Sequence, residues 1–227
     1  MPVKRPIEVY LELTPKRTFA GAVDWPGWCR SARTPEEALE ALAAYGPRYA
    51  KAIGKAAGFV TPADASRLQV TERLKGSPTT EFGAPAATPR SDRQPLSAAE
   101  LKRQLGLLQA AWRAFDRALK RHAGVELRKG PRGGGRDQGR MASHVFSAEQ
   151  SYLNALGARP PRATAKETVA EVRALRMAVL AALSARARDE PIDNPSGTKK
   201  RWPPRFYVRR AAWHALDHAW EIEDRAS

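Results

Sequence analysis

The sequence predicts an α+β protein, with a small α+β module in residues 1–75 followed by an all-α four-helix bundle in residues 96–227. Three observations lead to this prediction. Apolar and polar residues alternate near the N-terminus, as in a half-buried strand. Residues 76–95 hold four prolines among small and polar residues, which indicates a linker without helices. From residue 96 onward apolar residues recur at steps of three and four, as in amphipathic helices.

The first module should open with a β-hairpin. Ile7, Val9 and Leu11 alternate with more polar residues. Residues 14–17 supply a turn, and residues 18–23 form the returning strand. A half-buried hairpin of this kind needs a helix to cover its apolar face.

That helix is expected from Thr34 to about Gly58. Thr34 is a favourable N-cap, Pro35 takes the first helical position and Glu37 completes a capping box. A short strand at residues 68–71 would complete the sheet.

The hairpin, the WPGW motif at residues 25–28 and the TPEEA helix start at residues 34–38 resemble the HicB-like antitoxin domain, a small strand–strand–helix unit. The resemblance covers about residues 7–57 and implies a fold. No helix-turn-helix or ribbon DNA reader follows in the sequence pattern, so antitoxin activity is not implied.

The second part should form four amphipathic helices joined by polar loops, and therefore a four-helix bundle. Ser97 and Glu100 make a capping box at the start of the first helix, which continues to about Leu119. The other three helices are expected at about residues 136–156, 165–188 and 204–225.

Three histidines fall where they could share one metal ion. His214 and His218 are spaced i, i+4 in the last helix, so their imidazoles lie on one face about one turn apart. His144 lies in the second helix among apolar residues and should face the bundle interior. Three neutral imidazoles and one open position are typical of a catalytic metal site. The alternative is an ordinary pair of histidines hydrogen-bonded to neighbouring carboxylates.

One histidine on the second helix and an H-x-x-x-H pair on the last also resemble the DinB-like (YfiT-like) superfamily of metalloenzymes, which are four-helix bundles. The stretches that carry the resemblance are residues 144–153 and 213–224. The resemblance covers residues 96–227 and implies a metal held by the same three histidines, with a thiol or water as nucleophile. Imidazole ligands suit zinc, nickel, copper or iron alike, and we expect zinc or nickel, then iron.

Four further side chains are candidates for supporting the site. Glu149 lies about 140° around its helix from His144. It is therefore a better ion-pair partner for Arg209 or Arg210 of the last helix than a metal ligand. Asp217 could equally orient an imidazole or face the solvent.

Two basic segments, residues 128–136 and 199–205, precede the second and the last helix. If the helices alternate in direction, both segments lie at the same end of the bundle and frame one mouth. Arg132 and Arg136 would then form a lid over an anionic substrate. A flexible connector is the alternative.

Composition limits the remaining function classes. The net charge is +15, and 25 basic against 14 acidic residues follow residue 95. Of the 39 basic residues, 28 are Arg. The composition of a GC-rich genome therefore explains the positive charge as well as binding to a nucleic acid does. No apolar run approaches the roughly 18 residues of a membrane span, and no signal peptide is recognisable. The single cysteine, Cys29, excludes an internal disulfide and is expected to be a buried, unreactive side chain.

The favoured function is a cytoplasmic metal-dependent enzyme that transfers a low-molecular-weight thiol or hydrolyses a small-molecule substrate. A second copy of the chain, in a homodimer, is the expected protein partner, and neither a membrane nor a nucleic acid is expected. Two alternatives stay open. One is a non-catalytic regulatory protein whose N-terminal module recruits a partner, and the other is a basic nucleic-acid-binding protein. No catalytic side chain is assigned.

Overall fold

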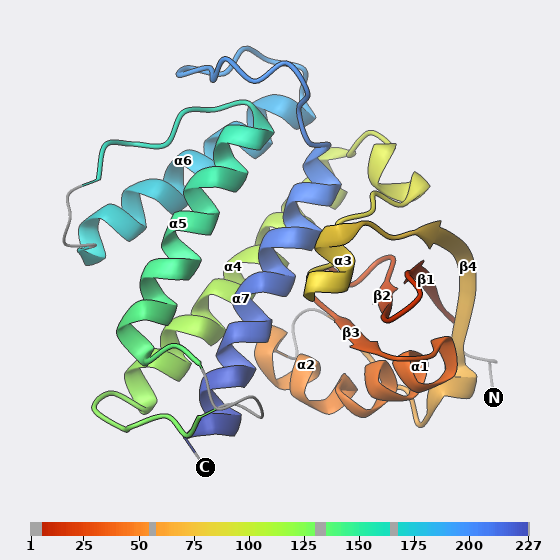
Figure 1. Ribbon diagram of the computed structural model, residues 1–227. Helices are drawn as coiled ribbons and strands as arrows, with labels where there is room; N and C mark the ends of the chain where they lie inside the picture. The colour runs from red at the N-terminus through yellow and green to blue at the C-terminus, as the bar shows by residue number, and fades with distance from the viewer. Residues whose placement is uncertain (1–5, 55–57, 130–134, 164–167, 227) are drawn as a thin grey trace.

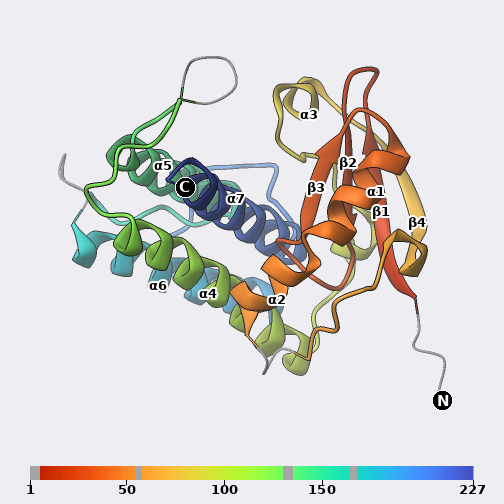
Figure 2. The same ribbon diagram turned by 90° about the horizontal axis from the view of Figure 1, so that it is seen from below.

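The computed structural model describes residues 6–54, 58–129, 135–163 and 168–226. The fold is mixed α/β, with a four-stranded sheet on one side and four long helices on the other (Figure 1 and Figure 2). Within these residues no helix is both long and apolar enough to cross a membrane.

Four strands form the sheet: β1 (Ile7–Leu13), β2 (Thr18–Ala22), β3 (Cys29–Ala32) and β4 (Leu68–Lys75). Their order is β3-β2-β1-β4, with antiparallel pairs between β1 and β2 and between β2 and β3, and a parallel pair between β1 and β4. The predicted hairpin and the last strand are confirmed. β3 was not predicted, because its residues CRSA carry no alternating apolar pattern.

The helix expected over residues 34–58 is divided into α1 (Pro35–Ala44) and α2 (Gly46–Ile53). The predicted capping box at its start is present. The division falls just before Pro47, whose ring and missing N–H do not fit the interior of a continuous helix. A short 3-10 helix, η2 (Ala65–Arg67), then leads to β4.

Both faces of the sheet are covered, although the alternating pattern predicts one exposed face. α1 packs against one face. On the other face Tyr10 and Glu12 are fully buried. Glu12 accepts hydrogen bonds from the Thr80 hydroxyl and from the Ala86 N–H. Tyr10 and Glu12 are therefore part of an interface, and the prediction that one face of the hairpin is exposed is wrong at these positions.

Residues 76–95 form part of this cover, and the expectation that they contain no helix is wrong. They hold a short helix, α3 (Pro78–Phe82), and a 3-10 helix, η3 (Arg90–Arg93). Pro78 is tolerated because it lies in the first turn of α3, where its missing N–H has no helical partner to lose. The prolines of this segment therefore limit the length of its helices without excluding them.

The four long helices lie close to the predicted ranges. They are α4 (Ala98–Arg121), α5 (Gln138–Leu156), α6 (Val169–Ala187) and α7 (Pro204–Arg225). α7 packs against the other three and also faces the sheet, so it lies between the two parts of the molecule (Figure 2).

α7 is buried on most sides because it contacts both parts. Trp213 meets the ring of Phe19 in β2 edge-on, with ring centroids 6.1 Å apart. The guanidinium of Arg209 binds both carboxylate oxygens of Asp92 at 2.8 and 2.7 Å and donates to the Val23 carbonyl at 2.8 Å. One hydrophobic core therefore spans the sheet and the helices.

The two basic segments lie at opposite ends of the helices, so the predicted common mouth is wrong. The Trp202 N–H donates to the Ala155 carbonyl near the end of α5, whereas the Arg128 N–H donates to the Arg225 carbonyl at the end of α7. α7 therefore runs antiparallel to α5. Ala158 and Arg159, which follow α5, lie beside the last part of α6. α6 therefore runs in broadly the same direction as α5, and the helices do not alternate in direction as predicted.

Candidate metal centre

The three predicted histidines converge between α5 and α7. The Nε2 atom of His214 lies 3.2 Å from Nε2 of His144 and 3.2 Å from Nε2 of His218. Ligands about 2.1 Å from one tetrahedral ion are about 3.4 Å apart, so this spacing fits a shared metal. The ligand atoms of the trio all lie within 4.8 Å of one another, and no other trio of His, Cys, Asp or Glu among the described residues does so.

The cluster is held by buried helix faces and opens toward α5. His214 and His218 are only 6% and 8% exposed, whereas His144 is partly exposed. Met141 and Val145, which neighbour His144 on α5, are buried in the core. Among the described residues of the cluster, His144 is therefore the one most accessible to an approaching molecule.

Glu221 and Arg225 extend the cluster along α7. Nδ1 of His218 lies 2.9 Å from the Glu221 carboxylate. A carboxylate can only accept a hydrogen bond, so the proton is on Nδ1, and the lone pair of Nε2 points toward His214. Arg225 donates to the other Glu221 oxygen at 2.8 Å. The hydrogen bond from His218 lowers the pKa of Glu221. The contact between His218 and Glu221 agrees with the alternative of a histidine hydrogen-bonded to a neighbouring carboxylate. Arg225 was missed, although its i+4 spacing from Glu221 was a visible signal.

Burial and nearby positive charge lower the pKa values of His214 and His144. Burial lowers the pKa of His214 well below its usual range, and the charges of His218 and Arg210 lower it further. Burial also lowers the pKa of His144, with a contribution from Arg136. Neutral imidazole is the form that binds a metal. Within the described part of the chain, Nδ1 of His214 has no hydrogen-bond partner.

Comparison of the chain with protein-family models, with curated proteins and with solved structures finds no match. The resemblances to the DinB-like superfamily and to the HicB-like domain therefore remain proposals. The geometry of the three histidines and of the side chains around them is the basis for assigning a function.

The predicted ion pair between Glu149 and the last helix is wrong. Glu149 is buried, and its Oε2 atom lies 3.6 Å from Nε of Arg176 in α6. Its position around α5, about 140° from His144, turns it toward α6 rather than α7. Arg176 also binds Asp116 of α4 at 2.7 Å. Burial raises the pKa of Glu149 to about 7, although Arg176 acts in the opposite direction.

Two other candidates face the sheet instead of the histidines. Arg209 binds Asp92, and Asp217 forms an ion pair with Arg30 of β3 at 2.8 Å. Both therefore join α7 to the rest of the molecule. Cys29 is buried as expected, and burial raises the pKa of its thiol to about 12.

Arg210 and Arg136 stay near the cluster. The Arg210 guanidinium lies 5.5 Å from the ring centroid of Tyr152, and this ring lies 5.8 Å from that of His214. Arg136 is exposed just before α5, on the chain that leads to His144. Arg132 lies outside the described residues. The positive charge of Arg210 and Arg136 beside the opening favours an anionic group on an incoming molecule.

Proposed function

We propose that His144, His214 and His218 bind one divalent transition metal ion and that the protein is a metal-dependent enzyme. The observation that supports this most directly is the pair of 3.2 Å distances between the Nε2 atoms. Three imidazoles with a fourth position open are typical of catalytic rather than structural sites. Imidazole ligands suit several transition metals, and zinc or nickel, followed by iron, is the ion that we expect.

When bound, such an ion lowers the pKa of a water or thiol at the open position. The chain itself supplies orientation and access. Glu221 and Arg225 fix the ring of His218, and the partly exposed side of the cluster admits the substrate. Arg136 and Arg210 would attract a carboxylate on that substrate. A low-molecular-weight thiol with a carboxylate group fits these requirements, with thiol transfer or hydrolysis as the reaction.

The arrangement of ligands also supports a DinB-like assignment for residues 96–227. One histidine comes from α5 and the i, i+4 pair from α7, which is the order of helices that the resemblance implies. For residues 1–75 the hairpin followed by α1 supports a HicB-like fold, again without antitoxin activity.

Replacement of the native metal by Co²⁺ tests the enzymatic part of this proposal. Addition of glutathione to the cobalt protein should produce a thiolate-to-cobalt charge-transfer band, because the thiol takes the open position. Arg210→Gln should raise the thiol concentration needed for half of this change, since it removes a charge near the opening. His122→Ala, which changes the histidine outside the cluster, should leave the titration unchanged. A cobalt protein whose spectrum does not respond to glutathione would contradict thiol transfer and leave hydrolysis or the regulatory alternative.

A further inference from the structure

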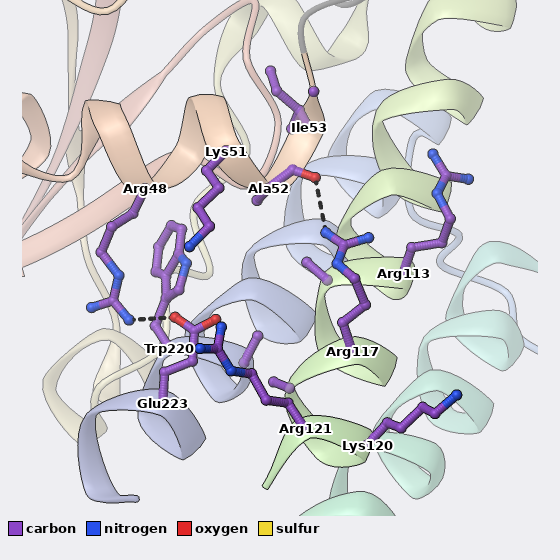
Figure 3. Close-up of a pocket in the computed structure, with 14 residues that line it drawn as sticks. Arg48, Lys51, Ala52, Ile53, Arg113, Arg117, Lys120, Arg121, Trp220 and Glu223 are labelled. Atoms are coloured by element: carbon purple, nitrogen blue, oxygen red, sulfur yellow. Dashed lines mark hydrogen bonds and ion pairs between the residues drawn. The ribbon is translucent and has the colours of Figure 1, made fainter. Parts of the chain in front are cut away.

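A basic groove lies between α2, α4 and α7, away from the histidines. Its volume is about 840 Å³. Figure 3 shows Arg48 and Lys51 on the α2 wall, and Arg117 and Arg121 on the α4 wall. The cationic side chains that line it are Arg48, Lys51, Arg113, Arg117, Lys120 and Arg121. Among the described lining residues Glu223 is the one acid.

Internal partners neutralise little of this charge. Arg48 binds Glu223 at 2.8 Å and Asp224 at 2.9 Å, so the local acids are already engaged. Arg117 donates to the Ala52 carbonyl at 3.5 Å, a neutral acceptor that connects the two walls. Several like charges on facing walls repel one another, and a bound anion would relieve that repulsion. Within the described ranges no hydrogen bond or ion pair engages the side chain of Lys51, Arg113, Lys120 or Arg121.

The floor of the groove is apolar, and none of the described residues that line it is an exposed aromatic. Ala118 and Ala219 lie there, both buried. Trp220 is only 4% exposed, and its ring packs against Tyr45 with centroids 5.1 Å apart. A single-stranded nucleic acid would need aromatic platforms for its bases, which this floor does not offer. The volume instead falls within the roughly 300–1,000 Å³ of small-molecule sites.

We propose that this groove binds a small organic molecule that carries two or more phosphate groups. Arginine forks bind phosphate oxygens in pairs and lysine adds a point charge, so the two walls can hold phosphates while the apolar floor contacts the carbon skeleton. The groove shares no side chain with the histidine cluster. The inference is therefore independent of the metal centre and of the function proposed for it.

Calorimetric titration of the full chain with a nucleoside triphosphate at physiological salt tests this inference. The double variant Lys51→Gln/Arg121→Gln removes one charge from each wall and should weaken binding by about tenfold or more, as expected for lost charge-assisted hydrogen bonds. The matched control Lys102→Gln/Arg173→Gln removes the same charge from exposed positions of α4 and α6 outside the groove. It should bind as the unchanged protein does, and so should His218→Ala.

Two further probes identify the ligand class. Inorganic triphosphate should bind more weakly than the nucleoside triphosphate, because it leaves the apolar floor uncovered. A short single-stranded oligonucleotide should also bind more weakly. The proposal would be overturned if the nucleoside triphosphate failed to bind, or if the two double variants weakened its binding equally. Tighter binding of the oligonucleotide or of inorganic triphosphate would also overturn it.

Discussion

Glu221 sets the proton position on His218, because its carboxylate accepts from Nδ1 at 2.9 Å and leaves Nε2 free. Loss of such a hydrogen-bond partner weakens metal binding by about 10- to 100-fold. We therefore predict that Glu221→Ala weakens Zn²⁺ affinity by this factor in a competition titration. Glu40→Ala, on the exposed part of α1, should have no effect. Equal affinity in the two variants would mean that Glu221 does not position the ligand.

Glu149 should make the stability of the protein depend on pH. Burial raises its pKa from 4.5 to about 7 in the folded state, so the neutral carboxyl is favoured there. The contribution of the buried Glu149 carboxyl to the free energy of unfolding is fully present below about pH 4.5 and is lost as the pH rises through about 7. Between about pH 5 and pH 8, the free energy of unfolding should fall by about 2 to 3 kcal/mol more in the unchanged protein than in Glu149→Gln.

Denaturant unfolding of both proteins at each pH measures this difference. Histidine titration is common to the two proteins and largely cancels in the comparison. A difference between them that does not vary with pH would show that Glu149 is already charged in the folded protein.

The three clustered histidines could be predicted from the sequence, but most of their neighbours could not. The i, i+4 spacing of His214 and His218 is local, and so is the apolar setting of His144. The partners of Glu149 and Asp217 come from α6 and from β3, and their identity depends on how distant elements pack. A pattern within one helix gives the direction of a side chain without giving the residue that meets it.

Among the secondary-structure elements, α7 depends most on contacts with the rest of the chain. Its Arg209 binds Asp92 of η3, and both side chains are almost fully buried. Asp92→Asn removes the carboxylate charge and leaves the guanidinium without a counterion. We predict that this substitution lowers the free energy of unfolding by about 3 to 5 kcal/mol.

Denaturant unfolding measures this loss, with Asp193→Asn as the control because Asp193 is exposed. Equal stability of the two variants would show that the ion pair does not hold α7 against η3.

Elements with strong local signals appear where the sequence predicts them. The capping boxes at Thr34 and Ser97 and the periodicity of residues 204–225 depend on residues within one helix. β3 lacks such a signal because it is short and polar. α3 has a capping box at Ser77 and Pro78 in its first turn, but the other prolines of its segment hide this signal. These two elements form because the hairpin and α7 offer surfaces on which they pack.

At the scale of the whole molecule, the sheet and the four helices should unfold together. One core includes side chains of both parts, and α7 contacts each of them. We predict a single transition in which far-ultraviolet circular dichroism, dominated by the helices, coincides with tryptophan fluorescence, which also reports on Trp28 beside the sheet. Two separate transitions would show that residues 1–75 and 96–227 are independent domains.

The metal content of the three-histidine cluster is the most direct test of the account. Calorimetric titration of metal-free protein with Zn²⁺ should give one ion per chain. His218→Ala should lower the affinity by at least about 100-fold, because loss of a ligand has a larger effect than loss of its hydrogen-bond partner. His122→Ala should bind as the unchanged protein does. A protein that binds no metal, or that binds it equally well after His218→Ala, would contradict the account.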